Sequence, residues 1–184
     1  MSNEFKSMLT QAQQDKNMVV VYRDELGGAF YAGVPVLQTD TLLVLAKEQE
    51  FNLDGFVVLR QKDITLVEQY DDNDFCRRVL EGEGVYQRVQ APKVPGCQSW
   101  QQLMEGILKN YGGWLTVECE SPTETLFFVG IGISSDKNYL MMRRVDADGS
   151  WHKDATTVPL QDITAVTFGG HYLSVYQKYC KKPK

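Results

Sequence analysis

The chain has 184 residues, of which 43% are hydrophobic, enough to bury one large core or two small ones. Its formal net charge of −5 argues against broad electrostatic attraction to nucleic acid or to anionic membranes. No apolar run approaches the ~18 residues that span a bilayer, and the first residues lack the pattern of a signal peptide. We therefore expect a cytoplasmic protein without membrane contact.

The charge is unevenly distributed between the two halves of the chain. Residues 1–92 hold 9 Lys and Arg against 15 Asp and Glu, a net charge of −6, whereas residues 93–184 hold 10 against 9, a net charge of +1. A polyanion would therefore be accommodated only by the second half. The four cysteines include no C-x-x-C pair, so we expect neither a disulfide nor a zinc site.

The first half is predicted to form one amphipathic helix followed by strands. Phe5, Met8, Leu9 and Ala12 have the i, i+3, i+4, i+7 spacing of one helix face within residues 4–16. Alternating apolar residues then predict strands, and the KDIT sequence at 62–65 marks a turn within the last segment. The predicted strand segments are 18–24, 29–36, 41–46 and 57–69, and a short helix at 74–81 follows them.

The second half repeats this order after a Gly- and Pro-containing segment, residues 82–98, that is predicted to be a linker. A helix is predicted at 99–111 with Ser99 as its N-cap. The predicted strand segments are 114–120, 126–133, 138–143 and 157–169, and a short helix is predicted at 172–180.

These repeated elements indicate an internal duplication. The QDIT sequence at 161–164 repeats KDIT at an offset of 99, and the offsets of the earlier elements are 95, 96 and 97. The offset changes only where turns are expected, and the extra residues of the second copy lie in SWHKDATT, residues 150–157. The predicted fold is mainly β: two tandem small barrels, each a helix plus about five bent antiparallel strands. The predicted boundaries are 1–81 for the first barrel, 82–98 for the linker and 99–184 for the second barrel.

The order of a helix and five strands resembles the Sm-like (Hfq/LSm-type) family. The resemblance rests on the Gly within a bent second strand (FYAGVPV and FFVGIGI) and on the terminal strand pair VVLRQKDITLV. It implies an RNA-binding activity, for which the family uses an Asp and an Asn after the second strand and an Arg-Gly before the fifth. Asp40 and Arg60 stand near these positions, but Leu43 and Val44 replace the Asn, and the second copy has Pro159 in place of the Arg.

No catalytic, cofactor-binding or metal-binding residues are predicted. The two histidines, His152 and His171, lie outside any recognisable catalytic motif and are expected to be exposed on loops. The acidic stretch 70–75 offers oxygen ligands to a cation, but it is also typical of the N-terminus of the helix that follows. We therefore expect that the protein is not an enzyme.

The candidate binding residues lie mainly in the second half. Trp114, Phe127, Phe128 and Tyr139 alternate within strands and are predicted to be core residues. Trp151 and His152 lie in the extra loop and are candidates for binding a protein partner, although packing of Trp151 on its own barrel is an equal alternative.

Two hypotheses about function follow. The favoured one is a non-enzymatic scaffold that associates through barrel edge strands with a protein partner or with itself, forming an oligomer. The alternative is an Sm-like RNA-binding protein, in which Arg60, Arg143 and Arg144 contact phosphate. An enzyme of unidentified reaction is a third, weaker alternative.

Overall fold

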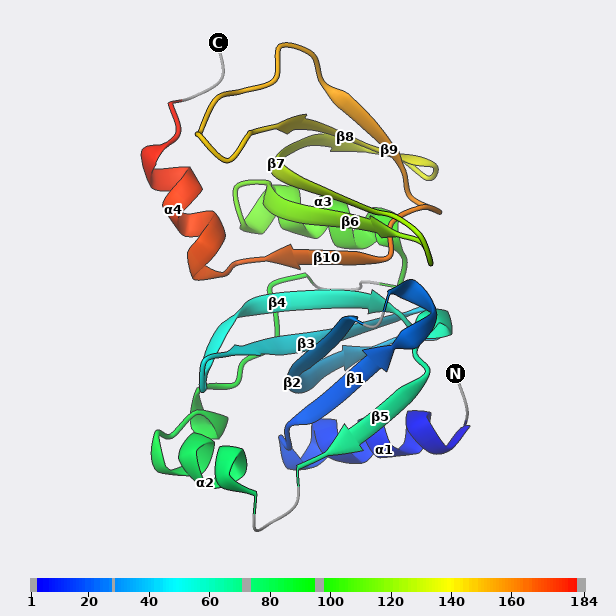
Figure 1. Cartoon of the computed structure of the whole chain (residues 1–184), viewed down its shortest axis with the longest axis vertical. Coiled ribbons are helices and arrows are strands. Elements are labelled where there is room, and N and C mark those ends of the chain that lie inside the picture. The colour runs from blue at the N-terminus through cyan, green and yellow to red at the C-terminus, as the bar shows by residue number, and fades with distance from the viewer. Residues whose placement is uncertain (1–2, 28, 71–73, 95–97, 182–184) are drawn as a thin grey trace.

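One antiparallel sheet of ten strands runs through the computed structural model of the chain (Figure 1). The structure describes residues 3–27, 29–70, 74–94 and 98–181. The strands lie in the order β5-β1-β2-β3-β4-β10-β6-β7-β8-β9, so the two halves of the chain occupy the two halves of the sheet. The predicted mainly β fold class is confirmed.

The first half contains one long helix and five strands, as predicted. They are α1 (Asn3–Asp15), β1 (Val19–Arg23), β2 (Ala29–Gln38), β3 (Leu42–Gln49), β4 (Asn52–Arg60) and β5 (Leu66–Gln69). A 3-10 turn at Gln61–Asp63 separates β4 from β5, where the KDIT turn is predicted. Helix α2 (Phe75–Gly82) follows, and Asp74 caps it by accepting a hydrogen bond from the Cys76 backbone N–H at 2.6 Å.

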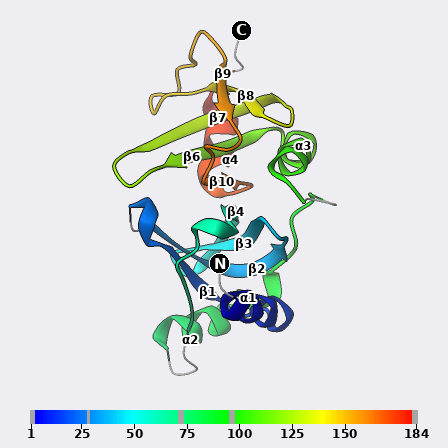
Figure 2. The ribbon, with the colours of Figure 1, turned by 90° about the vertical axis from the view of Figure 1, so that its right-hand side faces the viewer.

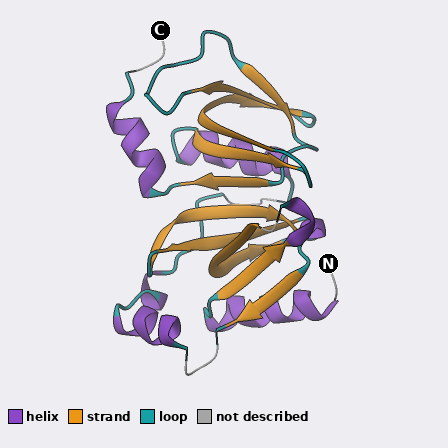
Figure 3. Ribbon diagram, in the orientation of Figure 1, coloured by secondary structure: helices purple, strands orange, loops and turns teal. Residues whose placement is uncertain are grey.

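The second half has the same sequence of elements (Figure 3). They are α3 (Trp100–Asn110), β6 (Trp114–Glu120), β7 (Thr125–Ser135), β8 (Tyr139–Arg144), β9 (Thr156–Pro159), β10 (Ala165–Phe168) and α4 (His171–Tyr179). The Ser99 side chain caps α3 by accepting a hydrogen bond from the Gln102 backbone N–H at 3.3 Å, which confirms the predicted N-cap. Figure 2 shows the strands of the second half stacked above those of the first.

Equivalent strands of the two halves also pair in the same register. With the sequence offsets of 97 and 99, the pair Val44↔Val58 of β3 and β4 corresponds to the pair Met141↔Thr157 of β8 and β9. A β-bulge interrupts the pairing of β2 with β3 and, at the equivalent position, the pairing of β7 with β8. The matching registers and bulges support the predicted duplication and define equivalent positions in the two halves.

Strands β3 and β4 are buried on both faces. Leu43 and Leu45 point into the core of the first half, whereas Leu42 and Val44 belong to the core of the second half. The second core also contains the inward face of α3, formed by Leu103, Met104 and Ile107. Strands covered on both sides read as continuous apolar runs, which accounts for the LLVLA sequence of β3. The double burial joins the two halves into one packed unit.

The sheet is open, so the prediction of two tandem small barrels is met only in its strand content. Closure of the first half would require β4 to pair with β5, but β4 pairs with β10 instead. Glycine allows neighbouring strands to approach closely. A Cβ atom at Gly130 would lie only 2.1 Å from the Arg143 carbonyl oxygen, so no larger residue fits there without backbone movement.

Two of the aromatic residues predicted for the core are exposed. Trp114 is buried as predicted, but Phe127 and Tyr139 are 52% and 46% exposed. Tyr139 alternates along β8 with the buried residues Leu140 and Met142, so its side chain lies on the other face of the sheet. The prediction was wrong because it took alternation of aromatic residues as a sign of burial without deciding which face is covered.

The predicted linker is packed against both halves. Among its described residues, only Tyr86–Arg88 form a 3-10 turn outside α2. Val85 and Val89 are buried in a cluster with Leu80 of α2, and Val94 is buried in the core of the second half.

Candidate binding interface

The two halves meet where β4 pairs with β10, a contact that we call the internal joint (Figure 1). Its register runs from Phe56↔Phe168 to Leu59↔Ala165, and Ala165 is buried in the core of the first half. In the sheet, the strands of the first half run from β5 at one edge to β4 at the other, and β10 is equivalent to β5. The internal joint is therefore head-to-tail, because it brings together two different edges of equivalent units.

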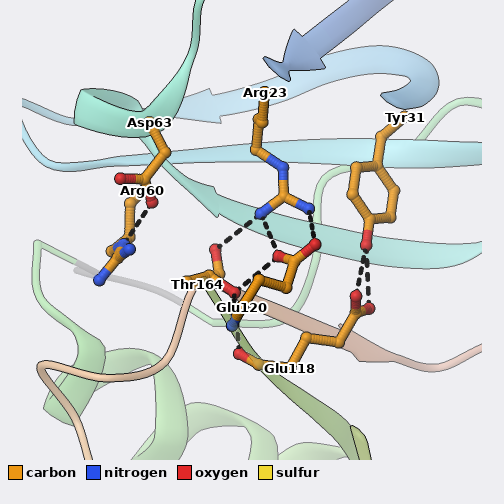
Figure 4. Close-up of polar contacts among 7 residues, drawn as sticks. All are labelled: Arg23, Tyr31, Arg60, Asp63, Glu118, Glu120 and Thr164. Atoms are coloured by element: carbon orange, nitrogen blue, oxygen red, sulfur yellow. Dashed lines mark hydrogen bonds and ion pairs between the residues drawn. The ribbon is translucent and has the colours of Figure 1, made fainter. Parts of the chain in front are cut away.

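A buried ion pair crosses the internal joint (Figure 4). The Arg23 side chain is fully buried; its Nη1 lies 2.6 Å from Oε2 of Glu120, and its Nη2 donates to Oε1 at 3.0 Å. The Thr164 hydroxyl donates to Glu120 Oε2 at 2.7 Å and accepts from the Glu120 backbone N–H at 3.2 Å. We call Arg23, Glu120 and Thr164 the Arg23 cluster. Removing one partner of such a pair leaves a buried charge without compensation.

A second polar contact lies beside the Arg23 cluster (Figure 4). The Tyr31 hydroxyl lies 2.9 Å from both carboxylate oxygens of Glu118, to which it donates. The Arg23 guanidinium carbon lies 4.9 Å from the centre of the Tyr31 ring. Burial raises the pKa of the Glu118 carboxyl above its usual range, and the hydrogen bond from Tyr31 opposes this rise. Burial and the nearby Glu118 charge likewise raise the pKa of Tyr31, so its hydroxyl stays a donor.

A pocket of about 500 Å³, the junction pocket, opens beside the internal joint. Its walls come from both halves. The first half supplies the loop before β3 and the turn after β4, and the second half supplies the start of α3 and the loops that precede β8 and follow β9. Trp100 supplies an aromatic wall and Asp40 one carboxylate. The cationic residues that line it are Arg60, Lys62 and Lys137. Proteins that bind single-stranded nucleic acid combine positive charge, which contacts phosphates, with aromatic rings, on which bases stack.

Arg60 is held in place at this pocket, since its guanidinium pairs with Asp63 (Figure 4). Its Nη1 also donates to the Gln161 carbonyl oxygen at 2.8 Å. Arg143 and Arg144 lie on β8 and do not line the pocket. Arg144 stacks over the Phe128 ring at 5.0 Å. The structure therefore does not bring the three predicted arginines together.

The two predicted partner-binding residues contact their own half. The Trp151 ring packs 5.5 Å from the Trp114 ring, and its Nε1 donates to the Lys181 carbonyl oxygen. The structure thus shows Trp151 packed on its own half, which is one of the two alternatives for this residue. His152 lies with Nε2 2.8 Å from Asp146 Oδ1 and Nδ1 3.3 Å from Arg144 Nη2, so both ring nitrogens are engaged.

Sequence reasoning missed Arg23, Glu118 and Glu120. A signal for Arg23 was present, because Arg23 continues the inward-facing alternation of Val19 and Val21. A charge at an inward position requires an opposite charge from elsewhere in the fold. The sequence does not say which acidic residue supplies it, because β1 and β6 are distant in the chain.

Comparison with known protein families, with curated proteins and with solved structures found no match. Among the described residues, no group of three or more His, Cys, Asp or Glu residues is placed to hold a metal ion. Asp71 and Asp72 of the predicted acidic stretch lie outside the described residues. In the described part of the chain, no helix has the length and apolar character needed to cross a membrane.

Replacing Glu118 with Gln tests the effect of burying a carboxyl at the internal joint. Because the folded-state pKa is raised, the protonated carboxyl stabilises the fold below the unfolded pKa of about 4.3, and this contribution is lost as the pH rises through the folded pKa. Gln keeps an acceptor for Tyr31 and does not ionise. We expect Glu118→Gln to be more stable than the wild type at neutral pH, with the difference shrinking as the pH falls through the raised folded pKa and smallest below the unfolded pKa of about 4.3.

Urea unfolding across this pH range measures the effect. The exposed Glu124→Gln is the control and should change little. A stability difference for Glu118→Gln that does not vary with pH would contradict the assignment.

Proposed function

We propose that the protein is a non-enzymatic, cytoplasmic scaffold of two duplicated Sm-like units that assembles with further copies of itself. In the proposed assembly, β9 of one chain pairs with β5 of the next, a contact that we call the outer joint. The observation that carries the proposal is that β9 and β5, the two ends of the open sheet, are the equivalents of β4 and β10. The outer joint repeats a pairing that the chain already makes within itself.

Burial at equivalent positions supports the outer joint. Leu42, Val44 and Val58 are at most 1% exposed, because the second half covers this face of β3 and β4. Their equivalents in the second half form what we call the outer patch: Tyr139, Met141 and Thr157. Tyr139 is 46% and Met141 is 41% exposed, and Thr157 is also exposed. The outer patch is thus the uncovered counterpart of a surface that is buried at the internal joint.

At the opposite end of the sheet, β5 exposes an apolar residue whose equivalent is buried at the internal joint. Leu66 of β5 is 38% exposed, whereas its equivalent Ala165 in β10 is fully buried. On the helices, Met8 of α1 is half-buried, whereas its equivalent Leu103 of α3 is fully buried. The β5 end therefore presents the apolar residues that would cover an outer patch.

A second pocket supports the same arrangement. A shallow pocket of about 440 Å³ beside β9 is lined by Lys137, Asn138, Tyr139, Pro159, Leu160 and Gln161. All of these residues except Leu160 are equivalents of the first-half wall of the junction pocket, and Lys137, Leu160 and Gln161 line both pockets. No helix residue lines this second pocket. The start of α1 in another copy would supply the missing wall. A head-to-tail contact of this kind generates a ring or a filament.

Met141→Glu tests the proposed assembly. A carboxylate in the centre of the outer patch would be desolvated on association, so we expect the variant to lose oligomers that the wild type forms. Analytical ultracentrifugation over a range of protein concentrations measures this. The matched control is Gln90→Glu, which adds the same charge on the exposed linker and should leave association unchanged.

A wild type that stays monomeric at every concentration would contradict the proposal. So would oligomers that persist unchanged in Met141→Glu.

A second candidate function, binding of single-stranded RNA, is favoured by the composition of the junction pocket. Arg60, Lys62 and Lys137 offer charge to phosphates, and Trp100 offers a ring on which a base can stack. The acidic net charge of the chain limits such binding to this locally basic pocket.

Fluorescence anisotropy with short U-rich and A-rich RNA at two salt concentrations tests this candidate. We expect salt-sensitive binding that Lys62→Glu/Lys137→Glu abolishes. The exposed pair Lys109→Glu/Lys153→Glu applies the same charge change outside the pocket and serves as the control. Equal loss in both double variants, or no binding by the wild type, would contradict a role for the pocket.

A further inference from the structure

The internal and outer joints have equivalent backbones but different polar residues. At the internal joint, Arg23 of the first half pairs with Glu120 of the second half. With the offset of 96, the outer joint instead places Cys119 opposite Asp24 of the next chain. The acid is retained, but the guanidinium that would pair with it is replaced by a thiol.

The other donors that the first half supplies to the internal joint are replaced in the same way. Tyr31, which donates to Glu118, is equivalent to Phe128. Arg60, which donates to the Gln161 carbonyl oxygen, is equivalent to Pro159. The β9 end of the chain therefore lacks the equivalents of these three side-chain donors.

The accepting half of the Arg23 cluster, by contrast, is intact at the β5 end. The Thr65 hydroxyl donates to Asp24 Oδ2 at 2.7 Å and accepts from the Asp24 backbone N–H at 3.1 Å. The equivalent contacts between Thr164 and Glu120 measure 2.7 and 3.2 Å. Asp24 is exposed and contacts Thr65 as Glu120 contacts Thr164, and no residue in the described part of the chain forms an ion pair with it.

On the basis of the proposed assembly, we infer that Arg23 distinguishes the two joints. Its cluster gives the internal joint a buried charge-assisted contact, whereas Cys119 at the equivalent position leaves Asp24 of a second copy without that cation, so the outer joint is weaker and reversible. The specificity comes from the side-chain donors. A guanidinium buried against Glu120 has no equivalent at the β9 end, so the chain associates through that end by strand pairing and by its apolar outer patch.

A gain-of-function variant tests this inference. Cys119→Arg places a guanidinium where the Asp24–Thr65 pair of the next chain can accept from it. We expect the dissociation constant of the outer joint to fall about tenfold relative to Cys119→Met, which matches the added length without the charge. Addition of Asp24→Asn to Cys119→Arg should remove the gain. Sedimentation measures the dissociation constants, at two salt concentrations because a partly exposed charge pair is screened by salt.

The outcomes separate this inference from the proposed function. If the wild type associates and Cys119→Arg is no tighter than Cys119→Met, the inference is wrong and the assembly stands. A gain that survives Asp24→Asn would also overturn it, because the new cation would then act elsewhere. If neither the wild type nor Cys119→Arg associates, both the proposed function and the inference fail.

Discussion

Burial of both faces of β3 and β4 is the constraint on which the rest of the structure depends. One face of this hairpin completes the core of the first half, and the other face completes the core of the second half. Neither core is complete without the other half, so the chain is a single folded unit despite its repeated pattern. The same constraint leaves the equivalent hairpin, β8 and β9, covered on one face only. The proposed assembly follows from this difference.

The polar residues at the internal joint add specificity to this apolar contact. Apolar burial is largely non-directional, whereas the Arg23 cluster accepts only a carboxylate in a defined place. The buried ion pair need not add net stability, because desolvation of two charges opposes their attraction. Its value in the proposed account is discrimination, since the equivalent residues at the outer joint cannot form it.

The elements and the repeat were predictable because they depend on local periodicity. The spacing of Phe5 to Ala12, the Ser99 cap and the KDIT turn each predicted what the structure contains. Which strand edges join the two halves was not predicted, since the pairing of β4 with β10 is a contact between residues distant in the sequence. The continuous apolar run of β3 indicates a strand that is covered on both faces, but only a strand was predicted there. The Arg23 cluster was also missed, because its partners come from strands that are distant in sequence.

Amide hydrogen exchange at low and high protein concentration tests the central claim most directly, because it locates a new strand pairing residue by residue. The account predicts that amides of β5 and β9 become protected together as the concentration rises. Those of β4 and β10, already paired within the chain, should stay equally protected throughout. Protection that appears at neither edge strand, or at only one of them, would contradict the head-to-tail outer joint.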